Sequence, residues 1–149
     1  MLKNKIPPPI VTLLFAALIY FSSKWSPNIV FSGQSIISLF LMTVGFIVLL
    51  IAISAFFKFK TTINPLKPED ATSLVTTGIF RLSRNPMYLG LLLLIISLWV
   101  KTGAVSGFIL VPSFIAYLNN FQILPEERAM NALFSGEYEV YCQQVRRWL

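Results

Sequence analysis

The 149-residue sequence contains no histidine and only one cysteine, Cys142. A single cysteine excludes an internal disulfide and a cysteine-based metal site, and the lack of histidine removes the commonest metal ligand. It also excludes nucleophilic catalysis by a Ser-His or Cys-His pair. No glycine-rich, phosphate-cradling motif is present either. We therefore expect no metal and no histidine-activated nucleophile.

Charge is also scarce. Charged residues make up 12% of the chain and hydrophobic residues 56%, whereas a soluble domain has about 25% charged residues. A bilayer core about 30 Å thick needs roughly 20 apolar residues per helix. We predict one all-α integral-membrane domain (1–149) with four transmembrane helices at 7–21, 34–57, 86–100 and 105–124, a cytoplasmic loop at 58–85 and a cytoplasmic tail at 125–149.

The basic residues predict an orientation. Lys3 and Lys5 precede the first apolar stretch as in a signal peptide, but no small-x-small cleavage site follows, so we expect a retained helix. Ten of the twelve basic residues fall on the face that holds both termini, and only Lys24 and Lys101 fall on the other. The positive-inside rule then predicts a multi-pass protein of the cell inner (plasma) membrane with cytoplasmic termini. Anionic lipid headgroups account for the net charge of +6, so we expect no nucleic-acid partner.

Two motifs flank the last two apolar stretches. Asn85 is a strong N-cap and Pro86 suits a first helical position, so a helix is predicted to start there. Its free N–H groups and dipole favour an anion, and Arg81 and Arg84 could add charge-assisted hydrogen bonds. The alternative is that the arginines only extend toward lipid headgroups and the Asn-Pro pair only caps the helix.

Glu126 and Glu127 follow the fourth apolar stretch directly. One interpretation is that these carboxylates stabilise the first turn of a helix by their interaction with the helix dipole. The other is that they bind an ammonium group or accept hydrogen bonds from ribose hydroxyls. The short connection 101–103 predicts that the third and fourth helices form an antiparallel hairpin, which brings the acidic pair to the same face as Asn85. Anion donors and cation acceptors would then line one cleft, which suits a zwitterionic ligand.

The second apolar stretch and the C-terminal tail contain residues that predict how they pack against the rest of the protein. Gly45 and Ser54 are predicted to allow close approach of a neighbouring helix. Pro125 is predicted to start an amphipathic tail helix that lies along the cytoplasmic interface or folds back under the bundle. Its apolar stripe has a spacing of three and four, and comprises Met130, Leu133, Phe134, Tyr138, Tyr141, Val145 and Trp148.

Three segments together resemble a known family. They are TTINP (61–65), SLVTTGIFRLSRNPMYLG (73–90) and LPEERAMNALFSGEYEVYCQQVRRW (124–148). The combination of Arg-x-Pro-x-Tyr-x-Gly, a Glu-Glu pair and Phe-x-Gly-x-Tyr resembles the isoprenylcysteine carboxyl methyltransferases and their prokaryotic relatives, a superfamily that includes phospholipid N-methyltransferases. The resemblance implies S-adenosylmethionine as cofactor in a cytoplasm-facing pocket, and a lipophilic acceptor that enters from the bilayer.

The resemblance also implies roles for individual residues. Three positions depart from the family pattern: Asn85 replaces the usual histidine, Phe80 a common tyrosine, and Gln122 an arginine assigned to the substrate in the eukaryotic enzymes. Gln122 and Arg146 are predicted to bind substrate, and Arg84 and Arg147 to be catalytic by steering an anionic head group. The predicted cofactor-binding residues are Thr72, Ser73, Leu74, Val75, Phe80, Asn85, Pro86, Met87, Tyr88, Glu126 and Glu127.

The predicted reaction is methyl transfer from a sulfonium to a lipid head group. The protein then has mainly to align the reactants and exclude water. A carboxylate acceptor is already ionised near pH 7, whereas an ammonium acceptor must first lose a proton. Two alternatives stay open: an NADPH-dependent membrane reductase of the sterol reductase type, for whose extra phosphate the chain has few spare basic residues, and a noncatalytic lipid-binding or scaffold protein.

Overall fold

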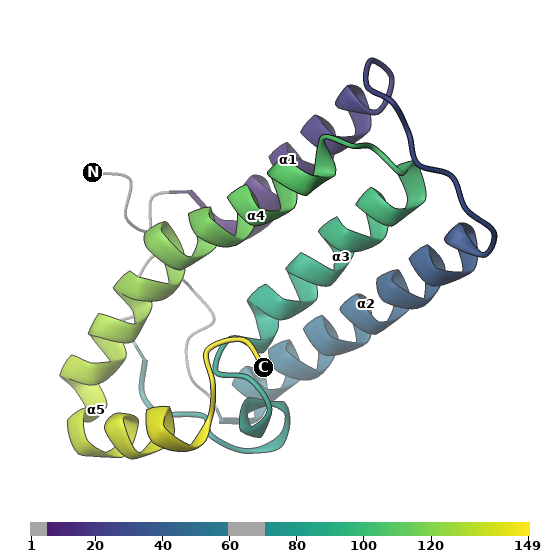
Figure 1. The fold of residues 1–149 in the computed structure, drawn as a ribbon. Coiled ribbons are helices and arrows are strands. Elements are labelled where there is room, and N and C mark those ends of the chain that lie inside the picture. Colours follow the sequence, from purple (N-terminus) through teal and green to yellow (C-terminus); the bar gives the residue numbers. More distant parts are fainter. Residues whose placement is uncertain (1–5, 60–70) are drawn as a thin grey trace.

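The computed structural model describes residues 6–59 and 71–149, and these parts are helical without a β-strand. The predicted all-α class is confirmed. The TTINP segment and the charged residues Lys3, Lys5, Lys60, Lys67, Glu69 and Asp70 lie outside the described residues. The elements are α1 (Pro8–Ser22), α2 (Gln34–Phe59), the 3₁₀ helix η2 (Gly78–Arg81), α3 (Pro86–Thr102), α4 (Gly107–Leu118), the π-helical turn η3 (Asn119–Ile123) and α5 (Leu124–Gln144), as Figure 1 shows.

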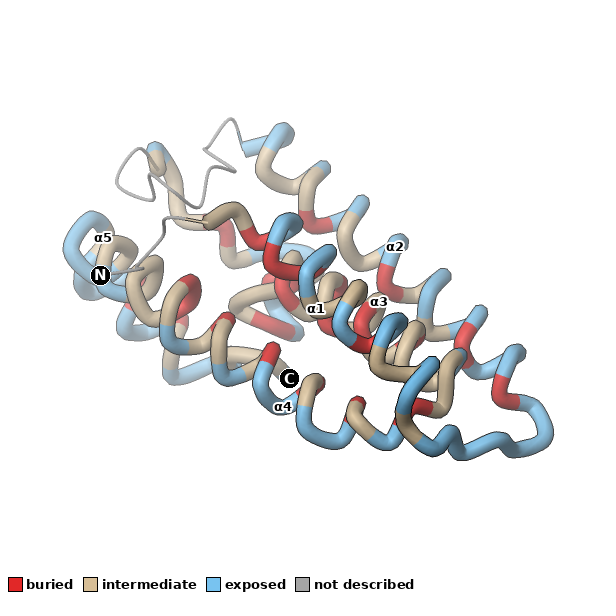
Figure 2. Tube along the Cα trace, turned by 90° about the horizontal axis from the view of Figure 1, so that it is seen from above, coloured by how far each residue is buried: buried red, intermediate tan, exposed pale blue. Residues whose placement is uncertain are grey.

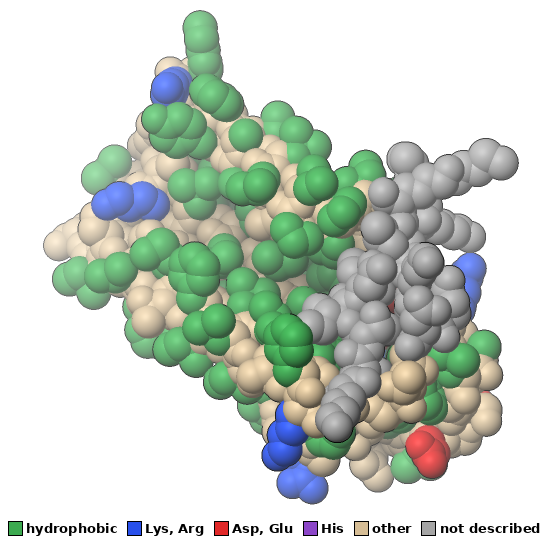
Figure 3. Space-filling model, turned by 180° about the vertical axis from the view of Figure 1, so that it is seen from behind, with side chains coloured by type: hydrophobic (Ala, Val, Ile, Leu, Met, Phe, Trp, Pro, Cys, Tyr) green, Lys and Arg blue, Asp and Glu red, His purple; other side chains and the backbone are tan. Residues whose placement is uncertain are grey.

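Two helices in the described part are long and apolar enough to cross a membrane. They are Gln34–Phe59, with a mean hydropathy of 3.0 over its best window, and the continuous helix Gly107–Gln144, with 1.4. The apolar helices α1 and α3 are shorter, with 15 and 17 residues. Hydrophobic side chains cover much of the surface in Figure 3, as expected for a protein whose solvent is partly lipid.

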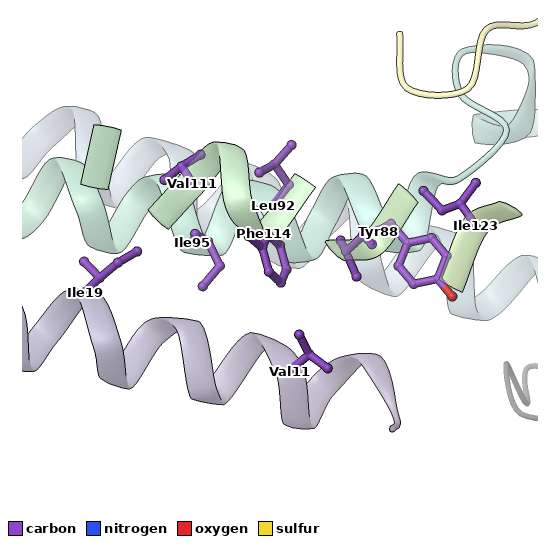
Figure 4. Close-up of a cluster of buried hydrophobic side chains, with 9 residues drawn as sticks. Val11, Ile19, Tyr88, Leu92, Ile95, Val111, Phe114 and Ile123 are labelled. Carbon is purple, nitrogen blue, oxygen red and sulfur yellow. The ribbon is translucent and has the colours of Figure 1, made fainter. Parts of the chain in front are cut away.

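Helix α3 lies at the centre of the packing. It contacts α2 most extensively, and it also contacts α1 and α4. Ile19, Ile95 and Phe114, from α1, α3 and α4, are almost fully buried in one cluster (Figure 4). Figure 2 shows buried positions recurring between exposed ones along α1 and α2, whereas α3 has no exposed residue from Pro86 to Val100.

Small residues bring α2 and α3 together. A Cβ atom on Gly90 would lie 2.6 Å from Leu49 Cγ and 3.0 Å from the Gly45 carbonyl oxygen. The same two helices are also joined by a pair of serines. The Ser38 hydroxyl donates to the Ser97 carbonyl at 2.9 Å, and the Ser97 hydroxyl donates to the Ser38 carbonyl at 3.0 Å. Close approach at Gly45 is thus confirmed. Ser54, by contrast, is exposed and donates to its own helix, so the same prediction for it is wrong.

The helix after α4 does not begin afresh at Pro125. Helix α4 continues through η3 into α5, so the expected interruption is wrong. A proline removes one helical hydrogen bond, and the wider turn just before it relieves the mismatch. Figure 1 shows α5 then bending back beneath α3, one of the two predicted courses of the tail.

The bend in α5 occurs at Ser135, whose φ is 21°. Ser135 and Gly136 are adjacent, a pair typical of sharp helix kinks. Beyond the bend Tyr138 and Tyr141 are buried, as the predicted stripe requires. Leu133 is 45% exposed, so its place in that stripe is wrong, whereas Met130 and Phe134 do pack against the buried cluster that contains Tyr138 and Tyr141.

Candidate functional site

A cavity of about 530 Å³ lies where α3 and α5 begin. This volume is within the range of about 300 to 1,000 Å³ typical of small-molecule sites. Its wall combines residues of α1, α2, α3 and α5 with residues before, within and after η2. The lining residues are Pro7, Pro8, Pro9, Leu49, Ile53, Phe56, Ala71, Ser73, Leu74, Val75, Phe80, Arg84, Asn85, Pro86, Met87, Tyr88, Leu91, Glu126, Glu127, Met130, Tyr138 and Tyr141.

Tyr88 and Glu126 meet in this wall. Helix α3 starts at Pro86, as predicted, and this places Tyr88 in its first turn, buried against the core. The Tyr88 hydroxyl donates to Glu126 Oε1, and in Figure 4 the hydroxyl points away from the packed cluster. The predicted pairing of the start of α3 with the acidic pair is therefore present.

Glu126 has the surroundings of a neutral acid. It lies beyond the apolar stretch that ends at Leu124, and within the described residues it has no ion-pair partner. Burial raises the pKa of the Glu126 carboxyl to about 8, and the negative charge of Glu127 adds to this, while the bond from Tyr88 acts in the opposite direction.

Glu127 has the opposite surroundings. The Arg147 guanidinium donates two hydrogen bonds to the Glu127 carboxylate, from Nε to Oε1 at 2.9 Å and from Nη2 to Oε2 at 2.7 Å. Arg84 Nη2 also lies 3.2 Å from Glu127 Oε1. Two arginines thus neutralise this carboxylate, and Glu126 is left as the acidic group of the pair without a cation.

Asn85 occupies the N-cap position of α3, but its side chain does not cap the helix. Its Nδ2 donates to the Arg147 carbonyl at 3.0 Å, and its backbone N–H donates to Ser83 Oγ at 3.1 Å. The expected capping bond is therefore wrong, because the residues after α5 pass close enough to engage the amide group.

The segment before α3 forms an apolar wall. Val75 and Phe80 are buried, and the Phe80 ring meets the Phe56 ring edge-on at 5.4 Å. The Tyr141 hydroxyl fixes this segment by donating to the Phe80 carbonyl at 2.6 Å. Thr72 is exposed and is not part of the cavity wall, unlike its neighbours in the predicted set.

Three other predicted site residues lie away from the cavity wall. Gln122 is fully buried and donates to the Ile6 carbonyl at 2.7 Å. Arg146 is exposed, and the Arg147 side chain contacts Glu127 from outside the cavity. Arg84 does line the cavity, and its Nε is buried without a hydrogen-bond partner. Substrate contact by Gln122 and Arg146 stays a prediction.

Several residues that line the cavity were not predicted as site residues. The uniformly apolar α2 does not reveal which face lines a cavity, although Leu49, Ile53 and Phe56 follow a spacing of four and three. The prolines at 7–9 begin the first predicted membrane stretch (7–21), and they also line the cavity. The missed set is Pro7, Pro8, Pro9, Leu49, Ile53, Phe56, Ala71, Leu91, Met130, Tyr138 and Tyr141.

Residues 33–137 match the family model of phospholipid methyltransferases. An uncharacterised protein of Haemophilus influenzae is 41% identical over 63 residues, which are 42% of this chain and all of that protein. No solved structure matches the chain. Since the family match spans more than half of the sequence, the chain belongs to the phospholipid methyltransferase family, the superfamily that includes the isoprenylcysteine carboxyl methyltransferases it was predicted to resemble.

Proposed function

We propose that this protein is an integral-membrane methyltransferase that uses S-adenosylmethionine and acts on a lipophilic acceptor at the cytoplasmic membrane face. The acceptor nucleophile is a carboxylate or another head-group atom. The observation that carries the proposal is the Tyr88–Glu126 contact in the wall of a cavity that also contains Arg84. Membership of a membrane methyltransferase family supports the reaction class.

The polar groups of the cavity fit the donor. S-adenosylmethionine carries an ammonium and a sulfonium, and Glu126 is a carboxyl without a cation partner in the described part of the chain. The donor also carries a carboxylate, and Arg84 Nε is a buried donor without an acceptor. Buried polar groups are normally paired, so a ligand that satisfies both is favoured.

The apolar walls of the cavity suit the apolar parts of the donor and the acceptor. Val75 and Phe80 suit the flat adenine ring, while Leu49 and Ile53 of α2 suit a lipid chain. Bound donor supplies an activated methyl group on its sulfonium. The chain itself then has to orient the two reactants in line and exclude water, which the tyrosine-carboxyl contact and the apolar walls favour.

Thermal unfolding in detergent tests the proposal, with S-adenosylhomocysteine, NADPH or no ligand added. We expect the first ligand alone to raise the melting temperature, because it binds only the folded protein. Tyr88→Phe and Glu126→Gln should each weaken its binding about tenfold or more, and both should remain folded. Arg128→Ala serves as the control, since Arg128 is exposed and absent from this cavity.

Other outcomes point elsewhere. Stabilisation by NADPH alone would support the membrane reductase, and stabilisation by neither ligand would support a noncatalytic lipid-binding or scaffold protein. Undiminished binding in both Tyr88→Phe and Glu126→Gln would remove the proposed site.

A further inference from the structure

Residues 145–148, called the tail segment here, cross the start of α3. Val145 leaves α5 with an extended backbone, at φ −126° and ψ 131°. The Arg84 amide then donates to the Arg146 carbonyl at 3.0 Å. The Arg147 carbonyl accepts from Ser83 Oγ at 3.3 Å and from Asn85 Nδ2 at 3.0 Å. The polar groups that precede α3 are therefore occupied by the tail segment.

The Arg147 side chain extends this contact to the acidic pair. Its guanidinium holds both oxygens of Glu127, while about a third of its own surface remains exposed. Glu127 lines the cavity and Arg147 does not. Arg147 thus touches the cavity only through other groups, its side chain through Glu127 and its carbonyl through Asn85.

A third anchor fixes the tail segment in place. Trp148 packs against the core, and its Nε1 donates to Asn119 Oδ1 at 3.1 Å in η3. The tail segment therefore joins the start of α3, the start of α5 and the π-helical turn between α4 and α5. These elements supply Tyr88 and Glu126, so their relative placement sets the polar end of the cavity.

We propose that Arg147 is a positioning residue, which holds Glu127 and thereby the cation-binding end of the cavity in the geometry that the donor needs. The proposal rests on the proposed methyltransferase function. Arginine presents a rigid planar fork that matches both oxygens of a carboxylate, whereas lysine offers a single point charge. Displacement of a reactive group by about 1 Å lowers the rate of a well-aligned reaction by up to about a hundredfold.

Without Arg147, Glu127 keeps only Arg84 as an ion-pair partner. Arg84 also contacts Cys142 through Nη1, so it cannot follow Glu127 freely. The carboxylate then gains freedom to turn into the cavity toward Glu126, where a second negative charge opposes ionisation of that carboxyl. In this proposal Arg147 restrains the Glu127 carboxylate and contacts neither the methyl donor nor the acceptor.

Binding of S-adenosylhomocysteine to the full chain in detergent tests the proposal. The variants are Arg147→Ala, Arg147→Lys, Glu127→Gln and the double variant Arg147→Ala/Glu127→Gln, with Arg128→Ala as a charge-matched control. We expect Arg147→Ala to weaken affinity about tenfold or more, because two hydrogen bonds to a charged group are lost, and Arg147→Lys to recover part of the loss. The double variant should bind no more weakly than Glu127→Gln alone, because Arg147 acts through Glu127.

Melting temperatures without ligand accompany every titration, so binding is compared below the melting temperature of the least stable variant. Equal affinity of Arg147→Ala and the parent would overturn the positioning role while leaving the methyltransferase proposal intact. Additive losses in the double variant would also overturn it, because they would show an effect independent of Glu127. A parent chain that does not bind the probe would overturn both proposals.

Discussion

Glu126 and Glu127 are neighbours with different chemistry. Glu127 faces two guanidinium groups, and Glu126 faces the hydroxyl of Tyr88. Neutralised by Arg84 and Arg147, Glu127 is a poor acceptor for another cation, so Glu126 is the better candidate to meet an ammonium or sulfonium. From the sequence alone either acid could have this role, because their difference comes from residues far away in the chain.

This difference predicts a pH dependence of donor binding. The pKa of Glu126 is raised from 4.5 to about 8, so the ligand-free carboxyl is mostly neutral at pH 7. The ammonium group of S-adenosylhomocysteine prefers the ionised carboxyl, so affinity for this ligand should rise between pH 6 and 8, by up to about tenfold per unit. Equilibrium titrations in detergent across this range measure the slope.

Glu126→Gln should abolish this slope, because the amide does not titrate. The exposed Glu139→Gln is the matched control and should keep it. A parent chain whose affinity is flat from pH 6 to 8 would show that Glu126 does not meet the ligand cation. The raised pKa of Glu126 also affects folding of the ligand-free protein. Its contribution to the free energy of unfolding is fully present below about pH 4.5 and is lost as the pH rises through about 8.

Among the elements, the pair α2 and α3 forms the frame of the site. Gly90 packs against Leu49, which also lines the cavity. Gly90→Ala should therefore lower the free energy of unfolding by about 1 to 3 kcal/mol and weaken ligand binding, because Leu49 has to move. Gly136→Ala is the control, since a Cβ atom there has no neighbour within 4 Å. Thermal unfolding in detergent compares them, and equal melting temperatures would contradict tight packing at Gly90.

The helices themselves were largely predictable from local signals. Apolar runs located α1 to α4 to within a few residues, and Asn85-Pro86 located the start of α3. The continuous passage from α4 into α5 was not predictable, because Pro125 normally interrupts a helix and the π-helical turn that accommodates it has no local sequence signature. The exposure of Leu133 was not predictable either, because a spacing of three and four assigns it to the same stripe as the packed residues Met130 and Phe134.

At the scale of the whole molecule, the site is assembled from distant segments. Asn85 and Arg147 are 62 positions apart, and Tyr88 and Glu126 are 38 apart. The short connection between the third and fourth stretches, together with the family resemblance, predicted that the motifs around Tyr88 and Glu126 lie in one cleft, and both residues line the same cavity. The contact between Asn85 and the tail segment was not predicted, because hydrogen bonds across such separations leave no periodic pattern.

The arrangement of the two ends of the molecule predicts its orientation in the membrane. Residues 23–33 pack against the turn after α3, where the Ile29 amide donates to the Gly103 carbonyl at 2.8 Å. The cavity, Ile6 and the tail segment lie together at the end where α3 begins. With the positive-inside rule, the cavity end is expected in the cytoplasm and Lys24 on the opposite side of the membrane.

The single cysteine makes this orientation measurable. In a Cys142→Ala background, Lys24→Cys should react with a membrane-impermeant maleimide in intact cells, whereas Glu139→Cys should react only after permeabilisation. Both positions are exposed, so a difference in labelling reports the side of the membrane and not burial. Labelling of Glu139→Cys alone in intact cells would invert the orientation and place the cavity outside the cytoplasm. Equal labelling of both would mean that the chain does not separate these two ends across the bilayer, because the reagent reaches only one side.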